Sequence, residues 1–187
     1  MFLLSLTGFI EADGNFYCGF DLNSKGIAVV VKNYMRISQK QLYKATSDLS
    51  KENNSNFYIM EKIREFLDIK NVTEIKRIKK DYIELSYEIR TTKKSSCDLL
   101  INYLSAYPLF SSKHQDYLDW CKFYHLRLSK KYQTIEGTSK LIYLKNSMNT
   151  KRTPSSAGWF IKQFLLLNVI WVNNNEIGKN KKDRLNS

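Results

Sequence analysis

The chain has 187 residues, 43% of them hydrophobic, and carries a formal net charge of +12 at pH 7. This apolar content suffices for a buried core and excludes a disordered protein, and the length fits one domain, or one domain with an appendage. The excess of lysine and arginine favours a polyanionic partner: nucleic acid first, an anionic membrane surface second. A protein with a solvated, lysine-rich surface is the alternative that charge alone leaves open.

Cysteine usage and the N-terminal residues bear on where the protein works. Cys18, Cys97 and Cys121 are widely separated and form no C-x-x-C pair, so we expect an intracellular protein with neither a disulfide framework nor a cysteine zinc site. Residues 1–10 contain no lysine or arginine, so we expect neither a secretory signal nor a mitochondrial presequence. An organellar protein would then be made inside the organelle, or lack its presequence here. The many Asn, Lys, Ile and Tyr residues fit an AT-rich organellar genome.

The start of the chain predicts a helix followed by two strands. Residues 1–13 are expected to be helical, and Gly14 ends the helix. Residues 15–22 alternate as a half-buried strand does, and a turn at 23–26 returns the chain into an antiparallel strand at 27–39. The side chains expected to face the core from these strands are Phe16, Cys18, Phe20, Leu22, Val31, Met35 and Ile37.

The next elements follow the same alternation of helices and strand pairs. The segment 41–56 is polar, and its second part is loop-like. The elements expected after it are a helix at 57–67, strands at 72–78 and 82–91, and helices at 97–107, 115–129 and 134–148. The resulting order, αββαββα followed by further helices, predicts the α+β class with a four-stranded antiparallel sheet.

The chain changes character after this last helix. Residues 150–157 are typical of a linker, and 159–172 are strongly apolar but interrupted by two polar residues. The apolar run is shorter than the ~20 residues that a membrane-spanning helix needs. We therefore expect a domain at 1–152 and a C-terminal extension at 153–187 with an apolar segment and a basic tail. The apolar segment would either fold over the domain or dock on another macromolecule.

The end of the first helix carries the most informative motif, Leu6-Thr7-Gly8-Phe9-Ile10-Glu11-Ala12-Asp13-Gly14. In a helix, Gly8 and Ala12 share one face, and small residues at this spacing let a second helix approach closely. Ordinary packing within one domain is the alternative. Asp13 falls at the helix C-terminus, where the helix dipole disfavours a negative charge, so a compensating partner such as Mg²⁺ is expected. Two paired helices would bring two such aspartates together, as two-metal phosphodiester hydrolysis requires.

This nonamer resembles the signature of the LAGLIDADG homing endonucleases, in which each of two helices contributes one copy to an interface. Three further stretches are similar to segments of that family, in the same order: Arg36-Ile37-Ser38-Gln39-Lys40, Tyr107-Pro108-Leu109-Phe110-Ser111-Ser112-Lys113-His114-Gln115-Asp116-Tyr117, and the helix from Gly137 to Asn149. Together the matches span residues 3–152. The resemblance implies a single-motif, organellar member of the family.

The resemblance also implies roles for particular residues. Asp13 would bind Mg²⁺, with the carbonyl of Ala12 as an additional ligand. Gln39 would position solvent or the scissile phosphate, and Lys113 would polarise the attacking water or stabilise charge on the phosphate. Glu11 would support the helix terminus. The helix that meets a partner is expected to use Gly8, Glu11 and Ala12.

The outer face of the sheet is the expected nucleic-acid surface, forming a saddle whose paired strands fit a DNA major groove. The residues expected to bind nucleic acid are Tyr17, Asp21, Lys25, Lys32, Tyr34, Arg36 and Lys76. Glu84 and Glu88 alternate with core residues and would face phosphate unfavourably. A merely solvated outer face is the alternative.

Because the chain contains one signature copy, it must form a homodimer, pair with another copy-bearing protein, or be inactive. The first hypothesis is a homodimeric, Mg²⁺-dependent endonuclease that cuts both strands of DNA, in a mitochondrion or chloroplast. The second is a non-cleaving relative that binds structured RNA, as an intron maturase or a component of an organellar ribonucleoprotein such as a mitochondrial ribosome. Retention of Asp13, Gln39 and Lys113 favours the enzyme. Binding to a membrane surface is a distant third.

Overall fold

The computed structural model describes residues 2–41 and 56–148 of the chain. Most of the polar segment 41–56 lies outside these ranges, as do the predicted linker 150–157, the apolar run 159–172 and the proposed extension 153–187. The division of the chain at residue 152 therefore stays a prediction.

The first helix passes directly into the first strand at Gly14. Helix α1 spans Phe2–Asp13 and strand β1 spans Gly14–Leu22, with no loop between them. A Cβ added at Gly14 would lie 2.6 Å from the carbonyl oxygen of Ile10, well inside van der Waals contact. Only glycine fits this junction, which confirms the predicted end of the helix.

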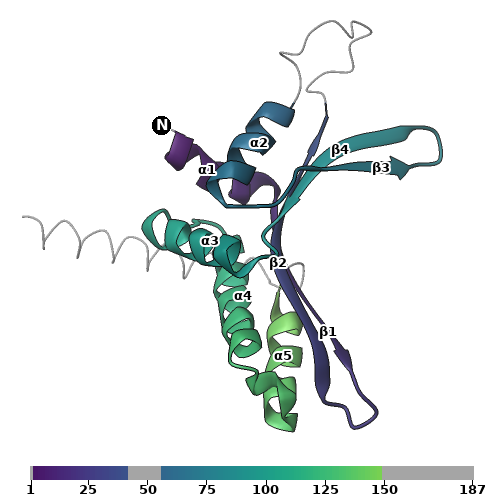
Figure 1. Ribbon diagram of the computed structural model, residues 1–187, viewed down its shortest axis with the longest axis vertical. Coiled ribbons are helices and arrows are strands. Elements are labelled where there is room, and N and C mark those ends of the chain that lie inside the picture. The colour runs from purple at the N-terminus through teal and green to yellow at the C-terminus, as the bar shows by residue number, and fades with distance from the viewer. Residues whose placement is uncertain (1, 42–55, 149–187) are drawn as a thin grey trace, which may run out of the picture.

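The sheet has four antiparallel strands in the order β1-β2-β4-β3. The remaining strands are β2 (Ala28–Lys40), β3 (Thr73–Ile78) and β4 (Ile83–Arg90). Strand β2 pairs with β1 along most of its length, and only its last residues, from Arg36 to Lys40, pair with β4. The hairpins β1–β2 and β3–β4 therefore meet over a short stretch and diverge away from it (Figure 1). The predicted α+β class and the saddle-shaped four-stranded sheet are confirmed.

The helices lie on one side of this sheet and leave its other side open (Figure 1). After α1 they are α2 (Phe57–Phe66), α3 (Lys94–Ala106), α4 (Lys113–Leu128), a short 3₁₀ helix (Lys131–Gln133) and α5 (Ile135–Ser147). Helix α3 begins at Lys94, three residues before the predicted start at residue 97. A hydrogen bond stabilises its polar first turn: Ser96 Oγ donates to the carbonyl oxygen of Asp68 at 2.7 Å.

The core forms where α4 crosses the inner face of the sheet. The rings of Phe16 and Trp120 are 5.7 Å apart, and Trp120 stacks on Tyr124 at 5.7 Å. Phe16, Cys18, Met35 and Ile37 are buried as predicted. The prediction for Leu22 is wrong: its side chain is 48% exposed because the pairing register shifts between Asp21 and Leu22.

Among the helices of residues 2–41 and 56–148, none is both long enough and apolar enough to cross a membrane.

Candidate active site and sheet surface

Three residues expected to act together meet at the C-terminal end of α1. Gln39 Nε2 donates to Asp13 Oδ2 at 2.6 Å. Lys113 Nζ donates to the carbonyl oxygens of Ile10 at 2.9 Å and of Glu11 at 2.6 Å. One helix end thus gathers side chains from α1, from the end of β2 and from the start of α4.

Strand register explains why Gln39 reaches Asp13. Because β1 begins immediately after α1, its first residue, Gly14, pairs with Ile37. Gln39 is two residues further along β2, so it lies beyond the end of β1 and on the same face as Ile37. There it pairs with Tyr87 of β4 and faces the helical side of the sheet. The direct junction at Gly14 therefore places an amide beside the carboxylate of α1.

Lys113 supplies positive charge at the same helix end. Burial lowers the pKa of its ammonium group, and the carboxylates of Glu11, Asp13 and Asp116 oppose that shift. A cation on the last carbonyls of a helix also complements the negative end of the helix dipole. The positive charge of Lys113 therefore offsets part of the unfavourable interaction between the Asp13 carboxylate and the helix dipole.

Glu11 points into its own chain. Its carboxylate accepts hydrogen bonds from the backbone amide of Ser111, at 3.0 Å, from that of Phe110, and from Ser111 Oγ. These contacts tie α1 to the segment that leads into α4. These contacts of the Glu11 carboxylate fit the support of the helix end that the resemblance implies, and the predicted use of Glu11 at a partner interface stays a prediction.

The small-residue face of α1 is open among residues 2–41 and 56–148. Gly8, Ala12 and Asp13 are exposed, and a Cβ added at Gly8 would meet no atom within 4 Å. The opposite face of the helix is buried through Leu6 and Ile10. Packing among the described residues therefore does not account for the small residues.

The donors at this helix end fit Mg²⁺ only in part. Asp13 offers an exposed carboxylate, and carboxylate and carbonyl oxygens are the ligands that this hard cation prefers. In residues 2–41 and 56–148, however, no group of three or more His, Cys, Asp or Glu side chains could hold a metal. The described part of one chain therefore offers Asp13 as an exposed carboxylate at this helix end, which by itself is fewer ligands than Mg²⁺ takes.

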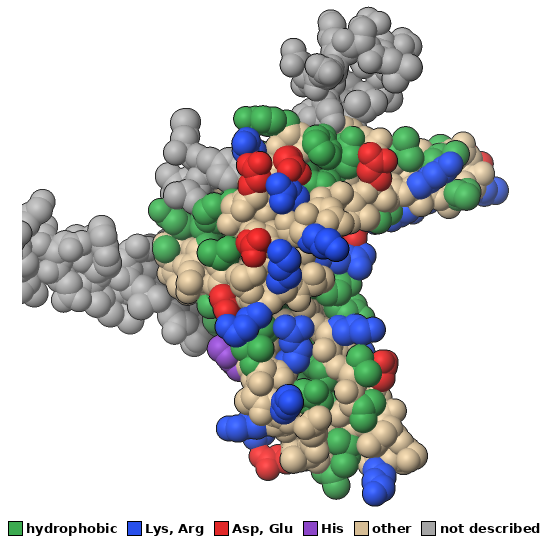
Figure 2. All heavy atoms as spheres, viewed as in Figure 1, with side chains coloured by type: hydrophobic (Ala, Val, Ile, Leu, Met, Phe, Trp, Pro, Cys, Tyr) green, Lys and Arg blue, Asp and Glu red, His purple; other side chains and the backbone are tan. Residues whose placement is uncertain are grey.

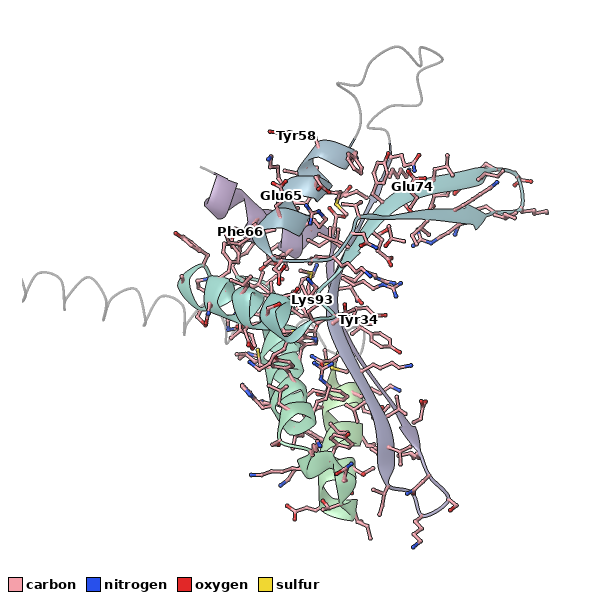
Figure 3. All side chains as sticks on the ribbon, viewed as in Figure 1. Tyr34, Tyr58, Glu65, Phe66, Glu74 and Lys93 are labelled. Carbon is pink, nitrogen blue, oxygen red and sulfur yellow. The ribbon has the colours of Figure 1, made fainter. Side chains whose placement is uncertain are left out.

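The open side of the sheet carries most of the residues expected to bind nucleic acid. Tyr17 pairs with Tyr34 across β1 and β2, and their rings stack at 4.6 Å. Figure 3 shows Tyr34 projecting from β2 away from the helices. Lys32 and Arg36 follow on the same face, and Asp21 and Lys25 are exposed toward the tip of the hairpin. Figure 2 shows lysine and arginine side chains along both hairpins.

Lys76 does not join this face. It pairs with Leu85, which alternates along β4 with Ser86 and Glu88 and so faces the helical side. The basic residue of β3 on the open face is Arg77, opposite Glu84. The sequence alone did not reveal this, because which residues of a short strand face outward depends on its pairing register.

The structure adds two residues that the sequence analysis did not select, Arg77 and Arg90. Both lie within 4.0 Å of Glu88, as does Arg36. Glu88 lies on the open face, as its alternation predicts, but it is only 2% exposed and its carboxylate contacts these arginines. The only signal for this cluster was the alternation of Glu84, Ser86, Glu88 and Arg90 along one strand.

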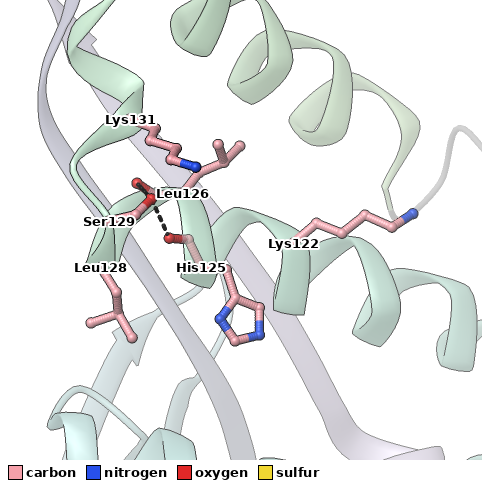
Figure 4. A pocket seen from close by; sticks show the side chains of 6 residues that line it. All are labelled: Lys122, His125, Leu126, Leu128, Ser129 and Lys131. Atoms are coloured by element: carbon pink, nitrogen blue, oxygen red, sulfur yellow. Dashed lines mark hydrogen bonds between the residues drawn. The ribbon is translucent and has the colours of Figure 1, made fainter.

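A separate hollow lies at the end of α4, lined by Lys122, His125, Leu126, Leu128, Ser129 and Lys131 (Figure 4). Inside it Ser129 Oγ donates to the carbonyl of His125 at 2.9 Å. It shares no residue with the group at the end of α1 or with the open sheet face, so we do not connect it with the chemistry of Asp13.

Comparison with known proteins identifies the family. A family model described as LAGLIDADG endonuclease matches residues 6–124, more than half of the chain. The chain therefore belongs to the LAGLIDADG endonuclease family.

Its relatives include proteins from fungi. The chain is 42% identical over 67 residues to Probable intron-encoded DNA endonuclease aI1 of Mycosarcoma maydis, covering 36% of this chain and 55% of that protein. It is 29% identical over 144 residues to Probable intron-encoded endonuclease 4 of Neurospora crassa, covering 77% of this chain and 22% of that protein. The chain thus spans about half, or less, of the curated relatives that it matches.

Solved structures show the same fold. The homing endonuclease I-TnaI matches with a TM-score of 0.60 at 19% identity, over 86% of this chain and 96% of its own. The LAGLIDADG meganuclease I-CpaMI, bound to uncleaved DNA, matches with a TM-score of 0.57 at 23% identity, over 86% of this chain and 50% of its own.

Proposed function

We propose that the chain is one subunit of a homodimeric, Mg²⁺-dependent endonuclease that cuts both strands of a specific DNA site. The observation that carries this proposal is the open face of α1, where Gly8 and Ala12 lie exposed beside an aspartate already oriented by Gln39. A helix face with small residues and no packing partner in the part of the chain that the structure describes fits a second copy of the same helix. Such a pairing would bring two Asp13 carboxylates together.

The lengths of the structural relatives support this pairing. This chain covers 96% of I-TnaI but only 50% of I-CpaMI. A chain of this size therefore matches nearly all of one solved chain and half of the other. Two copies of this protein would match the larger arrangement.

Each residue of the site then has a distinct task. Asp13 and the carbonyl of Ala12 would hold Mg²⁺, which supplies charge neutralisation at the phosphate and a more acidic bound water. Gln39 holds the Asp13 carboxylate in place by its hydrogen bond. Lys113 keeps a positive charge at the helix end, where it stabilises negative charge that develops on the phosphate. The open sheet face would bind DNA on both sides of the cut.

Sizing and cleavage test this proposal together. We expect a particle of about 44 kDa, twice the 22.0 kDa of one chain. We expect that particle to cut both strands of a duplex selected from a random-sequence DNA pool, in Mg²⁺ but not in EDTA. A protein that stays a monomer and leaves its selected duplex intact would reject the enzymatic proposal.

The RNA-binding alternative is an outcome of the same experiment. A protein that selects no duplex DNA but co-migrates with a structured RNA would be an intron maturase or a ribonucleoprotein component instead. For both functions we propose a mitochondrion or chloroplast as the place of action. The support is that the fungal relatives are described as intron-encoded and that the composition suits an AT-rich organellar genome.

A further inference from the structure

A buried carboxylate lies within the open face of the sheet. Glu88 belongs to β4, between Ser38 of β2 and Thr73 of β3, and its side chain is 3% exposed. Burying an ionised carboxylate costs several kcal/mol unless charged partners and hydrogen bonds compensate for it. The charged partners of Glu88 therefore account for its burial.

Three arginines surround this carboxylate. Arg90 Nε donates to Glu88 Oε1 at 2.7 Å, while Arg36 and Arg77 lie 3.9 Å and 3.8 Å from Oε2. The three come from β4, β2 and β3, so one side chain joins three strands. Their side chains remain 37%, 36% and 45% exposed for Arg36, Arg77 and Arg90. Each guanidinium carries five N–H donors, so donors remain for a ligand on the open side.

Aromatic rings extend the cluster to the fourth strand. The guanidinium of Arg90 lies over the ring of Tyr34 at 5.0 Å, and Tyr34 stacks on Tyr17. Cation–π contact and stacking fix the plane of a guanidinium as well as its position. The plane of Arg90 is therefore set by Glu88 at one side and by Tyr34 at the other.

The charge of the cluster does not suit it to general attraction of phosphate. Arg77 Nη1 also donates to Glu84 Oε1 at 2.8 Å. Three guanidinium groups thus face two carboxylates, which leaves a net charge of only about +1, whereas sequence-independent binding depends on the number of free cations that meet phosphates. The cluster instead fixes the orientation of its guanidinium groups. A planar guanidinium of fixed orientation can recognise guanine through two hydrogen bonds.

We propose that Glu88 is a positioning residue for sequence recognition: it orients Arg36, Arg77 and Arg90 toward the base edges of bound DNA and thereby sets specificity more than affinity. The proposal rests on the proposed function as a DNA-binding enzyme and deepens it. It assigns the middle of the saddle, where the two hairpins meet, as a place where guanine is read.

The test compares Glu88→Gln with a charge-matched control, Glu74→Gln. Both changes remove one negative charge from the sheet, but Glu74 is an exposed residue of β3 that pairs with Tyr87 and faces the helical side, away from the three arginines. Each purified full-length protein is used to select sites from a random-sequence DNA duplex pool. Its binding is then measured on the wild-type consensus duplex and on a fixed unrelated duplex, over a range of salt concentrations.

We expect Glu88→Gln to lower the preference for the consensus over the unrelated duplex about tenfold, the order expected for one lost bidentate base contact. Binding to the unrelated duplex should be unchanged or tighter, because a negative charge is gone. Guanine preference should weaken at particular positions of the selected motif. Glu74→Gln should keep the wild-type motif.

Three outcomes would overturn the proposal. The first is a folded Glu88→Gln protein with the wild-type motif and preference. The second is an equal loss of affinity on both duplexes, which would make Glu88 a structural residue only. If Glu88→Gln does not fold, Arg90→Lys is used instead: it keeps the charge but loses the planar fork, and an unchanged motif is the third contradicting result. A wild-type protein that selects no DNA motif would instead reject the proposed function itself.

Discussion

Gln39 at the end of β2 donates to Asp13 at the end of α1, with 2.6 Å between Nε2 and Oδ2. The contact joins residues 26 positions apart and exists because β1 starts without a loop after α1. It occupies Oδ2 and leaves Oδ1 of an exposed carboxylate available. An amide that fixes a carboxylate at the rim of an open sheet is better explained by a ligand than by stability, because exposed hydrogen bonds contribute little to folding.

Asp13→Asn should abolish cutting and leave the fold intact. Loss of the carboxylate should lower the cleavage rate by about 1000-fold or more, the order expected when several kcal/mol of charge stabilisation is lost. Binding to the selected duplex should be largely retained, and the melting temperature should be equal or slightly higher, since a negative charge at a helix C-terminus is unfavourable. Plasmid cleavage in Mg²⁺ and thermal melting check the two effects. Cutting at the wild-type rate would remove Asp13 from the chemistry.

Gly8→Leu should convert the expected dimer into a monomer of 22.0 kDa. A Cβ at this position meets no atom of the described residues within 4 Å, so folding should be unaffected, but the large side chain would hold a twin helix away. Ser105→Leu, on an exposed position of α3, is the control and should keep the dimer. Light scattering gives both masses. If the two variants have the same mass, the small-residue face of α1 is not an interface.

Two glycines of the same motif should respond to alanine in opposite ways. At Gly14 the new Cβ would lie 2.6 Å from the carbonyl oxygen of Ile10, so Gly14→Ala should destabilise the protein by about 1–3 kcal/mol or more. At Gly8 a Cβ meets no atom within 4 Å in the single subunit, so Gly8→Ala should stabilise the monomer, at concentrations where the dimer has dissociated, by about 0.5–1 kcal/mol, the difference in helix propensity. Urea unfolding of both variants checks the signs. Equal effects would mean that the junction at Gly14 is not as tight as the structure has it.

Part of the stability should be lost in acid through Asp98. Hydrogen bonds from Lys94 Nζ and from Tyr124 hold the pKa of this carboxyl below its usual range. The contribution is therefore present above the unfolded-state pKa of about 3.9 and is lost as the pH falls through the lower folded-state pKa. Asp98→Asn should be less stable than wild type at pH 7, and the difference should shrink toward pH 3. Asp81→Asn, in the β3–β4 turn, is the charge-matched control for urea midpoints across this range.

The sequence predicted the elements and the group at the end of α1 because both depend on local patterns. The alternation of β1 and the glycine after Asp13 determine where the helix stops, and motif resemblance selected Asp13, Gln39 and Lys113. The structure brings these three to one helix end. Their catalytic roles remain predictions.

Cross-strand relationships could not be predicted in the same way. Glu88 was expected to repel phosphate because a single strand does not show that arginines from β2 and β3 lie beside it. Lys76 was assigned to the wrong face for the same reason, since TEIKRI has apolar residues on both faces and only its pairing with β4 decides between them. The exposure of Leu22 follows from a register shift that no sequence pattern predicts.

Lys113→Met should separate the role of this lysine in cleavage from its role in stability. The methionine keeps most of the apolar stem but removes two hydrogen bonds to the last carbonyls of α1. Loss of a charged hydrogen-bond donor at a half-buried site should cost about 1–3 kcal/mol of stability. The cleavage rate should fall by about 100-fold, the order seen when one group that stabilises developing negative charge is lost.

Lys113→Arg should recover part of the stability, because a cation again complements the helix end, but little of the rate, because the planar guanidinium cannot occupy the same position. Urea unfolding and single-turnover cleavage on the selected duplex measure the two effects. A variant that loses stability but cuts at the wild-type rate would show that Lys113 only caps α1.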